Sequence, residues 1–227
     1  MELTILMPCL NEEKTIGDCI KQAKKFIEKN NLSAEILIAD NGSTDNSVKI
    51  AESLGARVVA ISKKGYGNAL KGGIKEARGK YIIMGDCDMS YDFLNLELFL
   101  EMLRQGIDFV IGNRFKGGIK KGAMPKLHRY FGVPILSFIG RIIYGVKIGD
   151  FHCGLRGFSS DAVRSLNLKS EGMEFATEII GAFSKKGFKI IEIPTVLNKD
   201  LRNGRSHLRS FRDGFRHLVL MLKTAFK

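Results

Sequence analysis

Two aspartates one residue apart, Asp86 and Asp88, are the residues of this 227-residue chain that are best suited to chemistry. They follow an apolar stretch that ends at Gly85, which permits a sharp turn. Alternate residues of an extended segment project from the same side, so both carboxylates can reach one divalent cation. Cations such as Mg²⁺ and Mn²⁺ prefer oxygen ligands and keep open positions for substrate phosphates. An Asp-x-Asp pair alone is more often two surface acids in a loop, so its place in the fold decides its meaning.

The first half of the chain alternates strand-like and helix-like segments with short links between them. Strands are predicted at 3–7, 35–39, 57–61 and 80–84, and helices from 12–13, capped by Asn11, at 44–54 and at 65–77. This order predicts an α/β fold with an open, Rossmann-like, mostly parallel sheet flanked by helices. Ligands of such sheets bind beyond the carboxyl ends of the strands. Each predicted strand ends in polar residues, and Asp86 and Asp88 stand at one of these ends.

The second half of the chain is less regular. We expect strands at 108–112 and 189–193, a loop at 116–122, a glycine-containing polar segment at 151–158, and helices at 127–146, 174–185 and 206–227. The helix at 127–146 is interrupted by Pro134, Gly140 and Arg141, which makes it too broken and too charged for a transmembrane span. We therefore predict one catalytic domain over 1–205, followed by a basic amphipathic helix over 206–227.

The formal charge of +12 is concentrated in two basic blocks. The segment from Arg114 to Lys147 holds eight Lys or Arg residues and no acid, and Lys199 to Lys227 holds eight against two aspartates. Such blocks favour an anionic partner, namely phosphates, an acidic membrane surface or nucleic acid. The alternative is that these basic residues are ordinary solvated surface side chains with no anionic partner. The sequence contains no nucleic-acid-binding motif, so we expect no nucleic-acid partner.

The predicted last helix has a basic stripe beside an apolar one. The stripes comprise Arg205, Arg209, Arg212 and Arg216, and Leu208, Phe211, Phe215 and Leu218. A helix of this kind can lie on an anionic bilayer, and the alternative is a helix docked on the core with its arginines in water. The four cysteines are scattered, and the N-terminus has no signal-peptide pattern. We therefore expect a cytoplasmic protein, peripheral on the inner face of the membrane.

Four ordered motifs carry a resemblance to a known family. They are Met7–Glu12 (MPCLNE), Ile38–Asp45 (IADNGSTD), Lys64–Leu70 (KGYGNAL) and Gly85–Asp88 (GDCD). Together they resemble the family 2 glycosyltransferases with the GT-A fold. Three later segments, 112–114, 150–158 and 173–178, resemble the polyprenyl-phosphate branch of that family, which includes the dolichol-phosphate sugar synthases. The likeness extends from about Leu3 to about Leu218.

The resemblance implies a role for each matching position. Nucleotide contacts would come from Pro8, Leu10, Asn11, Glu12, Asp40, Asn41, Lys64, Gly65, Gly67, Asp86, Cys87 and Asp88. Asp86 and Asp88 would also hold the metal, Mg²⁺ or Mn²⁺, with Asp88 as the principal ligand. The catalytic group would be Asp86, Asp88, Arg114, Arg129, Arg202 and Arg205, whose arginines clamp the donor and acceptor phosphates. Many relatives have a second Asp where this chain has Asn41, which leaves the donor open among UDP-, GDP- and dTDP-sugars, with UDP-glucose as the first choice.

The activity implied by the resemblance is transfer of a hexose from a nucleotide diphosphate to polyprenyl or dolichyl phosphate, with inversion. A lipid phosphate is already anionic and needs no general base. A hydroxyl acceptor, in a glycan or a soluble molecule, is the alternative, and Asp92, Asp150 or Glu174 would then accept a proton. We interpret Asp150, Glu174 and also His152 as structural residues. A non-catalytic anionic-lipid or nucleic-acid binding protein is the third reading, and a separate membrane subunit is a further candidate partner.

Overall fold

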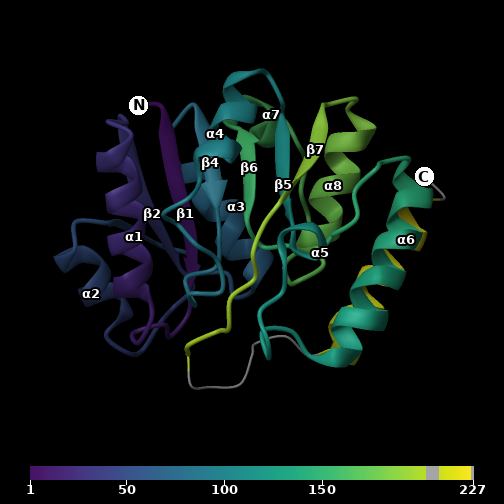
Figure 1. Cartoon of the computed structure of the whole chain (residues 1–227), viewed down its shortest axis with the longest axis horizontal. Helices are drawn as coiled ribbons and strands as arrows, with labels where there is room; N and C mark the ends of the chain where they lie inside the picture. Colours follow the sequence, from purple (N-terminus) through teal and green to yellow (C-terminus); the bar gives the residue numbers. More distant parts are fainter. Residues whose placement is uncertain (203–209, 226–227) are drawn as a thin grey trace.

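The computed structural model describes residues 1–202 and 210–225 and is built on a seven-stranded sheet of order β3-β2-β1-β4-β6-β5-β7 (Figure 1). Its strands are β1 Leu3–Cys9, β2 Ala34–Asp40, β3 Arg57–Ala60, β4 Tyr81–Met84, β5 Phe109–Asn113, β6 Arg156–Ser159 and β7 Ile190–Pro194. Only β6 runs antiparallel to its neighbours, β4 and β5. The predicted mostly parallel α/β sheet is therefore confirmed.

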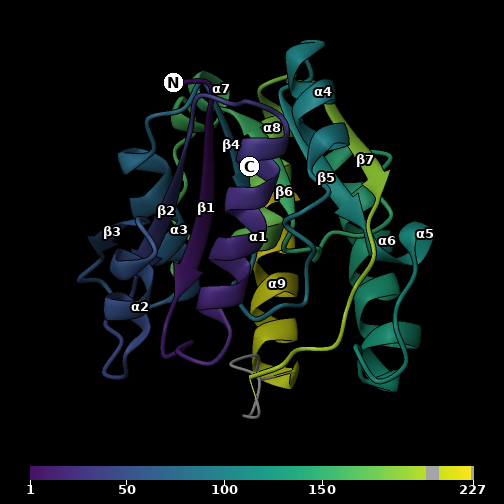
Figure 2. The same ribbon diagram turned by 60° about the vertical axis from the view of Figure 1, so that its left-hand side comes forward.

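Helices cover both faces of the sheet, as Figures 1 and 2 show. Helices α1 (Ile16–Lys29) and α4 (Glu97–Arg104) share one face and are joined by the ion pair of Lys29 with Glu97, at 2.8 Å. Helices α3 (Tyr66–Glu76), α7 (Ser160–Arg164) and α8 (Phe175–Lys185) cover the other. The remaining helices are α2 Ser47–Ser53, α5 Arg114–Gly117, the π-helical turn η1 His128–Gly132, α6 Val133–Tyr144 and α9 Ser210–Ala225.

The strand order creates a switch point between β1 and β4. The chain proceeds outward from β1 to β2 and β3, and then α3 returns it to β4 on the other side of β1. Connections on either side of such a point diverge and leave a crevice at the carboxyl ends of the two strands. The loop after β1 carries residues 10–12 and the loop after β4 carries Asp86 and Asp88, so the topology itself brings these motifs together.

Four elements were not predicted, the helices α4, α5 and α7 and the strand β6. Strand β6 lacks an apolar alternation because it begins with Arg156, which is 1% exposed. The guanidinium of Arg156 donates to three backbone carbonyl oxygens, those of Phe151, Cys153 and Ala176, at 2.8 to 2.9 Å. This buried cation therefore holds the polar segment before β6 against the start of α8.

Two predicted helices differ from the structure. The first was expected from Glu12 with Asn11 as its cap, but α1 begins at Ile16, and Asn11 has a left-handed φ of 58° and accepts a hydrogen bond from the Thr44 backbone instead. The helix expected over 127–146 is divided into η1 and α6. Within the described residues, no helix is long and apolar enough to cross a membrane.

Helix α9 packs against α6 and α8. Its buried side carries Asp213, His217 and Met221, and the Nδ1 atom of His217 lies 2.7 Å from the hydroxyl of Thr177 on α8. Arg216 pairs with Glu174 at 2.7 Å. The domain boundary predicted after residue 205 lies outside the described residues, as do Arg205, Leu208 and Arg209.

We expect Arg156→Met to destabilise the protein by about 3–5 kcal/mol, because it leaves three buried carbonyl groups without a donor. Urea unfolding followed by circular dichroism measures this difference. The matched control is Arg78→Met at an exposed position, which should change the unfolding free energy by less than about 0.5 kcal/mol. Equal stabilities of the two variants would contradict a structural role for Arg156.

Candidate active site

Hydrogen bonds between side chains and backbone hold the loop after β1 against the loop after β2. The backbone N–H of Asn11 donates to Ser43 Oγ at 2.9 Å, and Thr44 N–H donates to the Asn11 side chain at 2.8 Å. Glu12 N–H donates to Ser47 Oγ at 2.8 Å. Pro8 and Leu10 are half-buried in the same loop. The predicted nucleoside residues of these two motifs therefore form one connected surface.

Asn41 fastens the loop after β3 rather than projecting freely into the crevice. Its Nδ2 donates to the carbonyl oxygens of Ile61 and Lys63 at 3.0 and 2.8 Å, and its Oδ1 accepts the Gly65 N–H at 2.7 Å. Lys64 Nζ donates back to the Asn41 carbonyl oxygen at 2.7 Å. An Asp at this position would face two carbonyl oxygens, so the amide suits these contacts better than a carboxylate. The neighbouring Asp40 carboxylate accepts the backbone N–H groups of its own turn, at Gly42 and Ser43.

The glycines that begin α3 are required by close packing. Gly65 has a φ of 125°, which disfavours any side chain, and a Cβ on Gly67 would lie 2.5 Å from the Ser170 carbonyl oxygen. The Gly67 N–H donates to the Glu171 carbonyl oxygen at 2.9 Å. Tyr66, between the glycines, donates its hydroxyl to Asp86 Oδ1 at 3.0 Å. The predicted motif at 64–70 thus reaches the paired acids through its tyrosine.

The two aspartates after β4 have different surroundings. Asp86 is half-buried, and burial together with the negative charge of Asp88 raises the pKa of Asp86 to about 6. Asp88 accepts the Ser90 N–H at 2.9 Å and the Ser90 hydroxyl, and its other oxygen lies 3.0 Å from Arg202 Nη2. Cys87, between them, is buried and donates its thiol to the Pro8 carbonyl oxygen. Cys87 is therefore anchored inward, between the two carboxylates of the loop.

A segment from the C-terminal part of the chain crosses this loop. Asn198 N–H donates to the Ser90 carbonyl oxygen at 2.9 Å, and Leu201 N–H donates to that of Asp88 at 3.1 Å. The segment ends in Arg202, whose guanidinium pairs with three carboxylates, those of Glu12 (3.1 Å), Asp88 (3.0 Å) and Asp200 (2.6 Å). Burial raises the pKa of Glu12 to about 7 despite the opposing effect of Arg202. Arg202 is thus the cation that joins the β1 and β4 loops.

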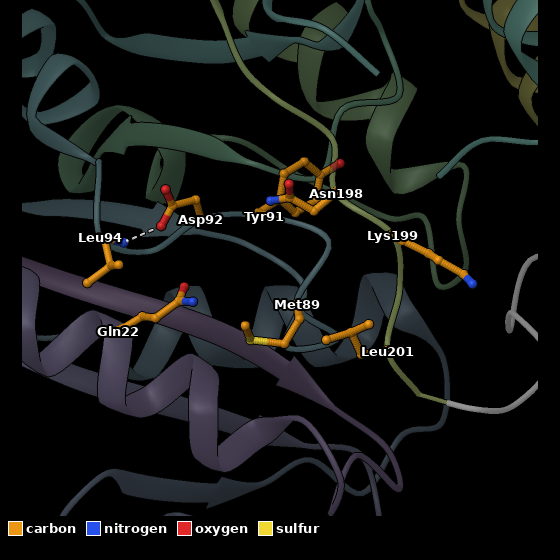
Figure 3. A pocket seen from close by; sticks show the side chains of 8 residues that line it. All are labelled: Gln22, Met89, Tyr91, Asp92, Leu94, Asn198, Lys199 and Leu201. Atoms are coloured by element: carbon orange, nitrogen blue, oxygen red, sulfur yellow. Dashed lines mark hydrogen bonds between the residues drawn. The ribbon is translucent and has the colours of Figure 1, made fainter. Parts of the chain in front are cut away.

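A pocket of about 450 Å³ lies between this segment, the loop after Asp88 and α1 (Figure 3). It is lined by Gln22, Met89, Tyr91, Asp92, Leu94, Asn198, Lys199 and Leu201. Asp92 accepts hydrogen bonds from the Leu94 N–H at 2.9 Å and from the Asn95 amide at 2.6 Å. Both of its carboxylate oxygens are therefore engaged in a turn within the loop.

Two other predicted arginines lie away from the Asp86–Asp88 loop or are already paired. Arg114 is 8% exposed, and its Nε and Nη2 atoms donate to both carboxylate oxygens of Asp150 at 2.7 and 2.8 Å. Arg129 lies on η1 with its guanidinium 5.5 Å from the ring centre of Tyr130. The interpretation of Asp150 as structural thus agrees with its contacts, which are with Arg114. Arg205 lies outside the described residues.

The carboxylate oxygens of Asp86 and Asp88 fit a divalent cation whose other ligands come from the substrate and water. Asp86 and Asp88 supply carboxylate oxygens, the ligands that Mg²⁺ and Mn²⁺ prefer. A Cβ on Gly154 would lie 2.4 Å from Asp86 Oδ2, so the glycine makes room for that oxygen. Within residues 1–202 and 210–225, no cluster of three or more His, Cys, Asp or Glu residues is placed to hold a metal ion. The remaining coordination positions would therefore fall to water and phosphate oxygens.

The sheet order, the polar strand ends and the paired acids define a GT-A fold. The chain superimposes on the crystal structure of glucosyl-3-phosphoglycerate synthase from Mycobacterium tuberculosis in complex with Mn²⁺, UDP and glucosyl-3-phosphoglycerate. The TM-score is 0.76 at 20% identity, over 99% of this chain and 79% of that one. Residues 4–166 match the family described as Glycosyl transferase family 2, and the chain belongs to that family.

The chain is similar in sequence to two transferases from Haloferax volcanii. The low-salt glycan biosynthesis hexosyltransferase Agl6 is 41% identical over 98% of this chain and 54% of its own length. A dolichyl-phosphate hexose transferase is 27% identical over 94% of this chain and 89% of its own length. The chain thus spans about half the length of Agl6. The predicted family and fold class are confirmed.

Sequence reasoning missed two polar residues of the site, Ser90 and Asp200, and the contact of Tyr66 with Asp86. Ser90 follows Asp88 by two residues, a spacing typical of a side chain that closes a turn on an aspartate. Asp200 precedes Arg202 by the same spacing and binds its guanidinium. Both patterns were readable in the sequence. The Tyr66 contact was not, because it depends on how α3 meets the loop after β4.

Replacing Glu12 with Gln is expected to stabilise the protein at high pH. The pKa of this carboxyl rises from 4.5 to about 7 on folding, so between these values the folded state binds more protons than the unfolded state. The stability of the wild type therefore falls as pH rises through this window, by about 1–3 kcal/mol. Glu12→Gln removes that cost, and its melting temperature should exceed that of the wild type by at least about 2 °C at pH 8, with little difference at pH 4.5.

Scanning calorimetry at the two pH values measures this difference. Glu28→Gln, at an exposed position on α1, is the control and should give no pH-dependent change. A Glu12→Gln variant that melts below the wild type at pH 8 would show that the ion pair with Arg202 outweighs the cost of burial.

Proposed function

We propose that this protein transfers a hexose from a nucleoside diphosphate to a polyprenyl or dolichyl phosphate. The observation that carries the proposal is the joining of Glu12, Asp88 and Arg202 at the β1–β4 switch point, with Asp86 beside them. Carboxylates and a guanidinium at one crevice are the groups that bind a metal-chelated diphosphate. The names of the hexosyltransferase and dolichyl-phosphate transferase relatives support the reaction and its acceptor.

The donor nucleotide would occupy the surface built by the loops after β1, β2 and β3. Asp40 and the surface around Asn11 face the base, while the Lys64–Gly67 turn lies along the ribose. The role of Asn41 is to position the turn, because its side chain is used within the protein. The positions Pro8, Leu10, Glu12 and Cys87 complete the nucleotide contacts of this proposal.

Transfer requires charge stabilisation at the leaving diphosphate. An acceptor phosphate oxygen bonds to the anomeric carbon while the bond from that carbon to the diphosphate oxygen breaks, which inverts the centre and releases a nucleoside diphosphate. Asp86 and Asp88 would hold Mg²⁺ or Mn²⁺, which neutralises charge on the diphosphate. Arg202 would exchange a carboxylate for a phosphate oxygen and thereby bind the donor. Arg205 and Arg129 are the proposed acceptor-side cations, and the paired Arg114 orders the wall of the site.

Most acids that could serve as a general base already have partners, and this favours an anionic acceptor, which needs no base. Asp150 is bound to Arg114, and Asp92 is bound within its own turn. Glu174 is the exception, because its Oε1 pairs with Arg216 while its Oε2 is buried and has no hydrogen-bond partner among the described residues. Transfer to a hydroxyl, with Glu174 as the base, is therefore the second candidate. Under the first, the domain over 1–205 works at the inner membrane face, with a separate membrane subunit as a further partner.

Asp88→Asn is expected to reduce transfer of labelled sugar to polyprenyl phosphate by about 100-fold or more, because the amide is a poor ligand for the metal and loses the charge that pairs with Arg202. The assay contains detergent, Mn²⁺ and, in separate reactions, UDP-, GDP- and dTDP-sugars. Asp18→Asn on the exposed side of α1 is the control and should retain full transfer.

The acceptor class is decided by a second pair of measurements. Transfer to the lipid that survives in Glu174→Gln supports the phosphate acceptor, since that reaction needs no base. Metal-dependent turnover of donor without product on the lipid would move the acceptor to a hydroxyl. A protein that binds none of the three nucleoside diphosphates would refute the proposed activity.

A further inference from the structure

The outer side of η1 and α6 carries large apolar side chains that the rest of the described chain leaves uncovered. Their exposed fractions range from 51% to 68%, and they are Leu127, Tyr130, Phe131, Ile135, Phe138 and Ile142. We call these six residues the α6 apolar face. Globular proteins rarely expose contiguous apolar patches larger than a few hundred Å² without a partner.

Helical geometry places these side chains along one ridge. Positions 131, 135, 138 and 142 recur at spacings of four, three and four residues, which is one side of a helix. The opposite side of α6 is packed on the core, because Ser137 and Gly140 are buried and a Cβ on Gly140 would lie 2.4 Å from the Phe151 ring. Ile139, Ile143 and Tyr144 are partly buried against the same core. The helix therefore already has a docking side, and a second apolar side is turned outward.

The segment of the chain that carries this face has charges of a single sign. Between Asp108 and Asp150 there are eight Lys or Arg residues and no acid. The guanidinium of Arg141 lies 5.7 Å from the Phe138 ring centre, and that of Arg129 lies 5.5 Å from the Tyr130 ring centre. Cations beside exposed aromatic rings suit the boundary between acyl chains and anionic headgroups. There the rings can enter the acyl region while the guanidinium groups pair with headgroup phosphates.

We propose that the α6 apolar face is the surface by which this protein lies on an anionic lipid bilayer. The inference deepens the proposed function, on which it rests for the presence of a lipid acceptor. A protein partner is less well matched, because the face is a helix ridge on a basic segment rather than a groove. The sequence placed membrane contact on the last helix, with docking on the core as the alternative. In the structure α9 lies beside α6 and packs its Asp213, His217 and Met221 side inward, while Phe215 of its predicted apolar stripe stays 67% exposed.

The location of α6 suits delivery of a lipid phosphate. Figures 1 and 2 show α6 at the margin of the molecule, with its first turn at the same end as the carboxyl ends of β1 and β2. A bilayer along this face would lie beside the crevice that contains Asp86 and Asp88. The acceptor phosphate could then reach the site while its polyprenyl chain stays in the membrane.

Vesicle sedimentation tests this surface with the whole chain. Wild type should sediment with phosphatidylcholine vesicles that contain phosphatidylglycerol, more weakly with pure phosphatidylcholine, and less as salt rises. Phe138→Ser combined with Ile142→Ser should lower the partition coefficient at least about tenfold, because two exposed anchors are lost. Arg141→Glu should weaken binding to the anionic vesicles several-fold.

Leu98→Ser is the matched control, since Leu98 is 43% exposed on α4 and lies outside the α6 apolar face. It should sediment like the wild type. Unchanged binding by the double variant, or no binding by the wild type, would overturn the proposal. So would a wild-type dimer in light scattering that the double variant converts to monomer, because the face would then bind a second copy.

Transfer to a short-chain polyprenyl phosphate dispersed in detergent separates this inference from the proposed function. The double variant should keep transfer close to wild type in detergent and lose it on vesicles. If neither protein transfers sugar in detergent, yet only the double variant fails to bind vesicles, the bilayer surface stands and the proposed function fails.

Discussion

The guanidinium of Arg202 is the contact on which the rest of the site depends. Three carboxylates from separate parts of the chain, those of Glu12, Asp88 and Asp200, converge on it. Acids brought this close in a partly buried crevice repel one another, and a cation among them offsets that repulsion. The arrangement is therefore stable as a protein structure and, under the proposed function, is also the site for a metal-chelated ligand. Both properties follow from the same concentration of negative charge.

Under the proposed function, the same constraint couples the donor to the metal. A diphosphate would reach Arg202 by taking the place of at least one carboxylate, and a divalent ion at Asp88 would remove the need for the guanidinium there. Donor and metal are thus expected to bind together, each making the contact of the other more favourable. Burial raises the pKa of Asp86 and of Glu12, and the negative charge of Asp88 adds to both shifts.

The parts of this site that could be predicted were those that depend on strand order alone. Polar residues at the ends of β1, β2 and β4 meet because parallel strands share one edge, so Asn11, Asp40 and Asp88 were placed without coordinates. What could not be predicted depends on partners far away in sequence. Arg114 reads as a phosphate clamp until Asp150 is found to bind both of its donor nitrogens. Strand β6 was missed because a buried arginine and a glycine replace the apolar alternation that identifies most strands.

The same reasoning accounts for the position of the membrane surface relative to the predicted one. Both α6 and α9 have basic and apolar residues at helical spacing, so the pattern alone cannot say which helix uses its apolar side inside the protein. Packing separates the two helices only in part. Helix α9 buries Met221 but leaves Phe215 of its predicted apolar stripe 67% exposed, and α6 docks through the buried Gly140 together with the partly buried Tyr144. The difference is one of extent, because η1 and α6 together leave a ridge of large apolar side chains exposed beside two arginines. A layer of lipid phosphates over acyl chains is the surface that would accept both.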